Sequence, residues 1–107
     1  MRFLRPHIPA IQALCEQHRV AELNAFGSVL REDFGPESDV DLLVVFQRSP
    51  EMNAFQQYFG LLEDLENLLG REVELVSDRA IRNPYFRQEV DETKQPLYVA
   101  PEAEALL

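Results

Sequence analysis

The stretch that decides the fold runs from Phe26 to Phe46 and reads FGSVLREDFGPESDVDLLVVF. Asp39 and Asp41 are separated by one residue and come directly before the apolar run that ends this stretch. Residues i and i+2 of a strand share a face about 6.5 Å apart, so both carboxylates converge beyond the strand end. Their repulsion costs free energy that a divalent cation such as magnesium would offset. We therefore predict a central buried strand over 39–46 with a metal site at its start.

A glycine–serine pair precedes this strand. Gly27 and Ser28 end a predicted strand over 20–27, and Ser28 is placed to cap a short helix through about Asp33. Glycine lets a phosphate approach the backbone, and the serine hydroxyl and free N–H groups of a first helical turn can bind it. Arg31 lies three residues beyond Ser28 and could reach the same phosphate. A capped helix with a surface arginine is the plain structural alternative.

Short helical and extended patterns alternate along the rest of the chain. The pattern predicts helices over 9–18 and 52–69, a strand over 71–77 with Val73 and Leu75 inward, a helix capped by Asn83, a strand over 95–100 and a tail from about 100 to 107. In the long helix, the predicted core-facing stripe is Phe55, Phe59, Leu62, Leu65 and Leu69. These elements predict an α/β fold with a small mixed β-sheet flanked by helices.

Composition restricts the classes of partner. Ten Lys and Arg residues against nineteen Asp and Glu leave a net charge of −9, which disfavours direct nucleic-acid binding. No apolar run approaches the roughly 18–20 residues of a membrane span, and the one cysteine suits a reducing cytoplasm. For the isolated residues we expect a surface position for His7 and His18, packing for Cys15, Tyr58, Tyr85 and Tyr98, and a solvated charge for Arg71 and Arg79.

The combined motif resembles a known superfamily. Gly27-Ser28, Arg31 and then Ser38-Asp39-Val40-Asp41 are similar to the glycine–serine and Asp-x-Asp motif of the DNA polymerase β-like nucleotidyltransferases. More narrowly, the chain resembles the minimal nucleotidyltransferase (MNT) family, the antitoxin half of HEPN–MNT toxin–antitoxin pairs. The segments Arg82–Arg87 and Pro96–Tyr98 look like that family's C-terminal part. The resemblance implies one minimal nucleotidyltransferase domain over residues 1–107.

That resemblance also implies the roles of the site residues. Asp39 and Asp41 would hold two magnesium ions, and Gly27, Ser28, Arg31 and Ser38 would contact the nucleotide. The family usually has a third carboxylate, an aspartate, on a neighbouring strand. Glu72 and Glu74 share a face there, and strand parity does not choose between them. The apolar neighbours of Glu74 and the resemblance favour Glu74 as the third catalytic and metal-binding carboxylate.

The implied reaction transfers AMP from ATP to a tyrosine of a cognate HEPN ribonuclease toxin in the cytoplasm, which neutralises the toxin. A homo-oligomer or a hetero-oligomer with the toxin is expected. Two alternatives remain at this point. The chain could neutralise its partner by stoichiometric binding with weak or no catalysis, or it could be a small-molecule nucleotidyltransferase of the antibiotic-modifying kind. A small-molecule nucleotidyltransferase of that kind usually needs an additional helical domain.

Overall fold

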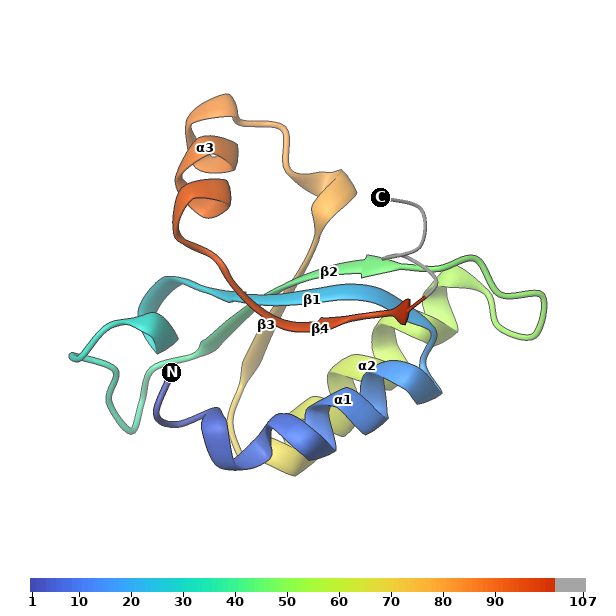
Figure 1. Cartoon of the computed structure of the whole chain (residues 1–107), viewed down its shortest axis with the longest axis horizontal. Coiled ribbons are helices and arrows are strands. Elements are labelled where there is room, and N and C mark those ends of the chain that lie inside the picture. Colours follow the sequence, from blue (N-terminus) through green and yellow to red (C-terminus); the bar gives the residue numbers. More distant parts are fainter. Residues whose placement is uncertain (102–107) are drawn as a thin grey trace.

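The computed structural model describes residues 1–101, so the predicted tail lies almost wholly outside the described residues (Figure 1). In chain order the helices and strands are η1 (Arg5–His7), α1 (Ile8–Gln17), β1 (Val20–Phe26), η2 (Gly27–Leu30), β2 (Val40–Phe46), α2 (Ala54–Leu69), β3 (Val73–Ser77), η3 (Asp78–Ala80), α3 (Pro84–Thr93) and β4 (Gln95–Val99). The η elements are 3₁₀ helices. No helix within the described residues is both long and apolar enough to cross a membrane.

The four strands form one mixed sheet in the order β3-β2-β1-β4. β1 is antiparallel to β2 and to β4, whereas β2 and β3 are parallel. This confirms the predicted mixed sheet and the central position of β2. The register places Asp41 of β2 beside Phe26 of β1 on one side and Glu74 of β3 on the other.

Helices cover the sheet unequally. α1 and α2 pack against one face, and α3 stands on the opposite side (Figure 1). The main core lies under α1 and α2 and includes Ile11, Cys15, Leu23, Leu42, Val44, Leu61, Leu65 and Leu75. A smaller cluster of Phe26, Leu43 and Val90 lies under α3. The β2 strand therefore has buried apolar side chains on both faces, which explains its unbroken apolar run.

The predicted stripe of α2 is wrong in its first half. Phe55 and Phe59 are 69% and 50% exposed, and the buried positions are Gln57, Leu61, Leu65 and Leu69. Both sets have helical spacing, so periodicity alone did not determine which one faces the sheet. Polar contacts favour the observed rotation, because the buried Gln57 amide donates to the carbonyls of His18 and Gln47.

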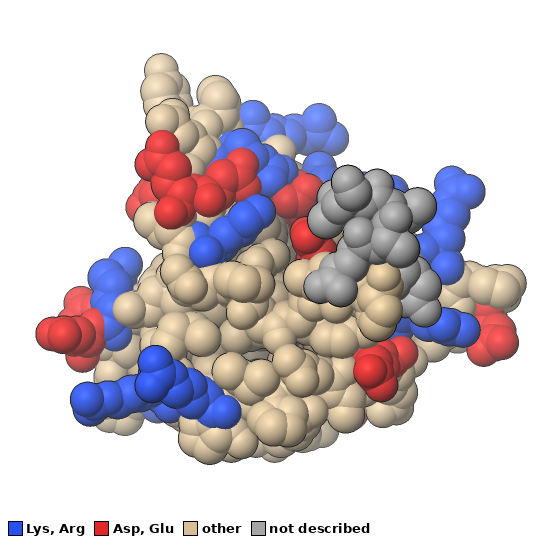
Figure 2. All heavy atoms as spheres, in the orientation of Figure 1, with Lys and Arg blue, Asp and Glu red and all other residues tan. Residues whose placement is uncertain are grey.

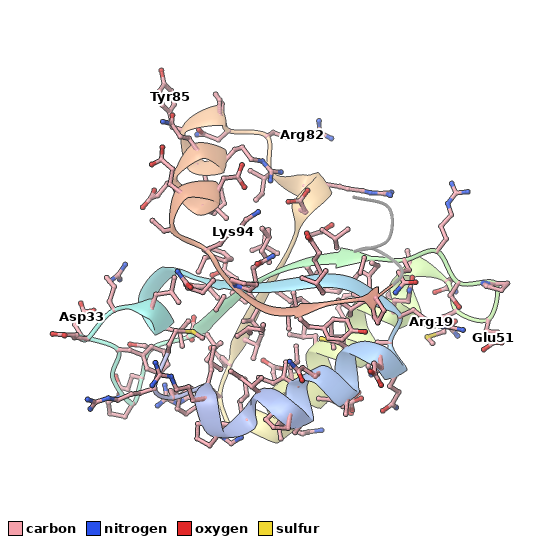
Figure 3. The ribbon with its side chains drawn as sticks, in the orientation of Figure 1. Arg19, Asp33, Glu51, Arg82, Tyr85 and Lys94 are labelled. Carbon is pink, nitrogen blue, oxygen red and sulfur yellow. The ribbon has the colours of Figure 1, made fainter. Side chains whose placement is uncertain are left out.

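The expectations for His18 and Tyr85 are wrong, whereas that for Cys15 is confirmed. His18 is buried, and its Nε2 lies 2.7 Å from the Asp64 carboxylate, which joins the end of α1 to α2. Tyr85 is 82% exposed, and its side chain points away from the sheet at the start of α3 (Figure 3). Cys15 packs in the core as expected, and burial raises its pKa to about 12. The thiol is therefore unreactive at neutral pH.

Helix side chains bind backbone groups of both outer strands. On β3, the Val73 N–H donates to the Glu66 carboxylate at 3.1 Å, and the Tyr58 hydroxyl donates to a carbonyl two residues further on. On β4, the side-chain amide of Gln12 donates to the Leu97 carbonyl at 3.2 Å. Each edge of the sheet is thus partly closed by a helix that packs beneath it.

Candidate active site

Two carboxylates from adjacent strands meet at the centre of the site. Asp41 and Glu74 share a register position in the parallel β2–β3 pair, so their side chains are neighbours. Burial, then the interaction with the Glu74 side chain and its charge, raise the pKa of Asp41 to about 6. The charge of Asp39 raises it slightly further, whereas a hydrogen bond from the Ser28 backbone N–H lowers it. Two of the three predicted carboxylates, Asp41 and Glu74, are therefore close enough to interact.

Gly27 allows this arrangement because it has no side chain. Its φ is +72°, and an added Cβ would lie 2.4 Å from Oδ2 of Asp41, far inside contact distance. The left-handed backbone turns the chain from β1 into η2, and Asp41 occupies the space that a side chain would fill. The sequence predicted that a phosphate approaches the Gly27 backbone. In the structure the group beside Gly27 is the Asp41 carboxylate, and phosphate binding stays a prediction.

Ser28 does not cap a helix as predicted. It lies inside the short η2, where Phe26 occupies the N-cap position, and the helix ends at Leu30 rather than near Asp33. The Ser28 hydroxyl donates instead to the Asp39 carbonyl at 3.2 Å. This contact ties η2 to the residue before β2. Binding of a phosphate by Ser28 stays a prediction.

Arg71 positions the turn that leads into β2, so the prediction of a solvated charge for this residue is wrong. Its Nη1 donates to the carbonyls of Gly35 and Ser38 at 2.9 and 3.0 Å. Within the same turn, the Gly35 N–H donates to the Ser38 hydroxyl at 3.1 Å. Ser38, predicted to contact nucleotide, therefore has a structural role in this turn. Arg71 lies two residues before β3, beside the segment that precedes β2, and only the parallel pairing of these two strands could have indicated the contact.

A cleft of about 820 Å³ opens beside the two carboxylates. Its walls are η2, the adjoining strand ends and α3, and the lining residues include Phe26, Gly27, Leu30, Arg31, Asp41, Glu74, Phe86, Glu89, Val90 and Thr93. Four predicted site residues, Gly27, Arg31, Asp41 and Glu74, thus line one cleft. Ser28, Ser38 and Asp39 do not line it, although Asp39 is near enough to influence Asp41.

The α3 wall was missed by sequence reasoning. Phe86 packs edge-on against Phe26 with ring centroids 6.0 Å apart, which places the start of α3 over the cleft. The Asn83 side chain caps the helix as predicted, accepting from two backbone N–H groups. Arg87 then fixes the helix to η3 through two 2.7 Å hydrogen bonds to Asp78. The helix, its cap and its proline could be predicted, but not its packing over the site.

The residues present fit a magnesium ion. Within residues 1–101, no three carboxylate, imidazole or thiol groups gather closely enough to form a complete protein-only metal site. Magnesium commonly takes one or two carboxylates and completes its shell with water and substrate phosphates. Asp41 and Glu74 supply such a pair, and a cation between them would offset the repulsion of their charges. The donor set therefore suits a metal that arrives with a nucleotide.

Comparison with known proteins agrees with this geometry. The profile of the Nucleotidyltransferase domain family matches residues 10–97. The chain therefore belongs to the nucleotidyltransferase domain family. A related protein of Thermococcus cleftensis, named protein adenylyltransferase MntA, is 39% identical over 70 residues, which are 65% of this chain and 68% of the relative.

Solved structures narrow the class to the minimal nucleotidyltransferases. One structure described as a proposed minimal nucleotidyltransferase is 35% identical, with a TM-score of 0.73 over 87% of this chain and 91% of that one. A Shewanella oneidensis structure, a tri-AMPylated HEPN toxin in complex with an MNT antitoxin, matches at 18% identity and a TM-score of 0.63, covering 95% of this chain and 77% of that one. At that identity the likeness shows a common fold.

Removing the Asp41 charge is expected to stabilise the metal-free protein. The folded pKa of Asp41, about 6, lies above its ordinary 3.8, so the folded chain binds more protons than the unfolded chain between these values. Stability from this group is therefore present at low pH and is lost as pH rises towards 6. Asp41→Asn should raise the free energy of unfolding at pH 7 by about 1 kcal/mol, allowing for solvent screening of this partly exposed group.

Urea unfolding in chelator, at pH 7 and pH 4, measures this effect. The advantage of Asp41→Asn over wild type should shrink at pH 4, where the wild-type carboxyl is already protonated. An asparagine variant that is less stable than wild type at pH 7 would show that the Asp41–Glu74 contact is not a repulsive one.

Proposed function

We propose that this chain transfers AMP from ATP to a tyrosine of a HEPN-type ribonuclease toxin in the cytoplasm and so neutralises the toxin. The observation that carries the proposal is the Asp41–Glu74 pair, held against Gly27 in an open cleft. The names of relatives support the activity. A solved complex of a HEPN toxin with an MNT antitoxin supports the partner, and a solved toxin–antitoxin structure with AMP-PNP supports the nucleotide.

Asp41 and Glu74 would hold magnesium with substrate phosphates, and Asp39 would contribute to a second ion. Bound magnesium supplies charge that neutralises the triphosphate and stabilises the leaving group. Arg31, on the η2 wall of the cleft, is placed to contact the outer phosphates. The acceptor oxygen forms a bond to the α-phosphorus, the bond from that phosphorus to pyrophosphate breaks, and Glu74 takes the acceptor proton.

The acceptor tyrosine is proposed to lie on the partner protein. Of this chain's own tyrosines, Tyr58 has its hydroxyl bonded to the Leu75 carbonyl, and the exposed Tyr85 points away from the sheet (Figure 3). The cleft beside Asp41 is instead open to a segment of a partner protein.

Stoichiometric binding is the second candidate, and one observation favours it. Glu74 stands where the family usually has aspartate, and its longer side chain lies beside the Asp41 carboxylate. If Glu74 stays beside Asp41 when nucleotide is bound, it would disturb the ligand geometry that magnesium requires. The chain would then silence its partner by covering it.

Mass spectrometry distinguishes the two candidates. Incubating the chain with its cognate HEPN toxin, ATP and magnesium should add about 329 Da, or a multiple, to a toxin tyrosine, because adenylation retains AMP and releases pyrophosphate. Excess chelator should abolish the addition. A silenced toxin that co-purifies with the chain at unchanged mass would instead establish neutralisation by binding.

A further inference from the structure

A second cavity, of about 760 Å³, lies beside η2 and shares part of its wall with the reaction cleft. Its lining includes Arg2, Phe3, Val29, Leu30, Arg31, Glu32, Phe34, Pro36 and Arg71. Leu30 and Arg31 line both cavities, so the two are direct neighbours. Figure 2 shows basic side chains gathered at the lower left, near the start of the chain marked in Figure 1. None of the predicted site residues except Arg31 lines this cavity.

The charge of this cavity is opposite to that of the protein. Three of the chain's ten Lys and Arg residues line it with one carboxylate, Glu32, although the net charge is −9. Arg2 makes no hydrogen bond or ion pair with any residue described by the structure. Arg71 bonds only to backbone carbonyls among the same residues, so no carboxylate neutralises it. A local excess of guanidinium groups favours an anionic ligand.

Aromatic rings lie against the fixed guanidinium. The Arg71 guanidinium carbon is 4.6 Å from the ring centroid of Phe3 and 4.8 Å from that of Phe34, and these rings are 5.3 Å apart. Two carbonyls and two rings therefore hold Arg71 in place before any ligand arrives. The cavity combines planar and apolar surfaces with positive charge, and its volume lies in the range of small-molecule sites. A ligand with both a phosphate and a flat ring matches this lining.

We propose that this cavity is a second nucleotide site, which binds an adenylate through its phosphate at Arg2 and Arg71 and its base against the apolar lining. The adenylate has two possible sources, free AMP or an adenylate already attached to the partner. Only the second source rests on the proposed function. An acidic peptide would use the charge but not the aromatic surface, so the lining favours the nucleotide.

Binding of AMP in the presence of chelator tests the site directly. Chelator removes the metal-dependent nucleotide binding expected in the reaction cleft, and the measurement needs no transfer activity. By calorimetry, Arg2→Glu should weaken AMP binding by about tenfold or more, because it reverses a charge at the site. Arg5→Glu is the matched control, since Arg5 is also an exposed N-terminal arginine but does not line the cavity. Arg5→Glu should change the affinity for AMP by less than about twofold, because a charge outside the cavity is screened by salt.

The pattern of AMP additions to the partner then distinguishes the sources. If the site holds an adenylate already attached, Arg2→Glu should leave the first addition unchanged and reduce later ones, whereas Arg5→Glu changes neither. Loss of AMP binding with an unchanged pattern identifies free nucleotide as the ligand. Absence of AMP binding to wild type, equal losses in both variants, or tighter binding of a poly-glutamate peptide would overturn the proposal.

Discussion

Asp41→Asn is expected to reduce the rate of AMP transfer by at least about 10³-fold while the protein remains folded. Asp41 is the carboxylate that contacts Glu74, lies against Gly27 and accepts from the Ser28 N–H, so it is central to the site. Asparagine keeps its shape but removes the negative charge that would hold a cation. The same change should stabilise the metal-free fold, so loss of rate would not reflect unfolding.

The rate is measured as AMP added to the partner per minute at saturating ATP and magnesium. Glu63→Gln is the control for loss of one negative charge, because Glu63 is exposed on α2 and lines neither cavity described above. It should transfer AMP at close to the wild-type rate. An Asp41→Asn variant within tenfold of wild type would remove Asp41 from the catalytic machinery.

Gly27→Ala is expected to reduce transfer by about 10²–10³-fold, because one methyl group would displace the key carboxylate. The new Cβ would lie 2.4 Å from Asp41 Oδ2, and the backbone φ of +72° is unfavourable for any residue with a side chain. Either Asp41 rotates away from Glu74 or the turn into η2 shifts. The strained conformation should also lower the free energy of unfolding by about 1–2 kcal/mol.

Gly70→Ala is the matched control for the backbone part of this effect. Gly70 ends α2 with a φ of +63°, but an added Cβ there would have no atom within 4 Å. It should cost about 1 kcal/mol of stability and leave transfer unchanged. If both alanine variants transfer AMP at the wild-type rate, the Gly27–Asp41 contact has no part in the reaction.

Local sequence signals predicted most elements because their causes are local. The apolar run after Asp41 determined the position of β2, Gly70 terminates α2 in the left-handed conformation, and Asn83 with Pro84 begins α3. The rotation of α2 could not be predicted in this way. Phe55 and Leu61 both belong to helically spaced sets, and contacts from distant segments select between them.

The candidate site was predicted in part for a similar reason. Strand alternation indicated the Asp39 and Asp41 pair, and the family resemblance selected Glu74 over its neighbour. The structure brings Asp41 and Glu74 together through the parallel register of two strands. Arg71 was missed because its partners are backbone carbonyls more than thirty positions earlier, at Gly35 and Ser38. The sequence shows that an arginine is present, but it does not show which backbone carbonyls the arginine contacts.

The side chains bonded along β3 and β4 also affect how the chain can assemble. An unprotected sheet edge can pair with a strand from another molecule, the route taken by domain swapping and cross-β aggregation. Here the Glu66 and Gln12 side chains already occupy backbone groups that an incoming strand would need. These hydrogen bonds would have to break before a strand of another molecule could pair with either edge. Association with a toxin or a second copy is therefore expected through helix faces and loops.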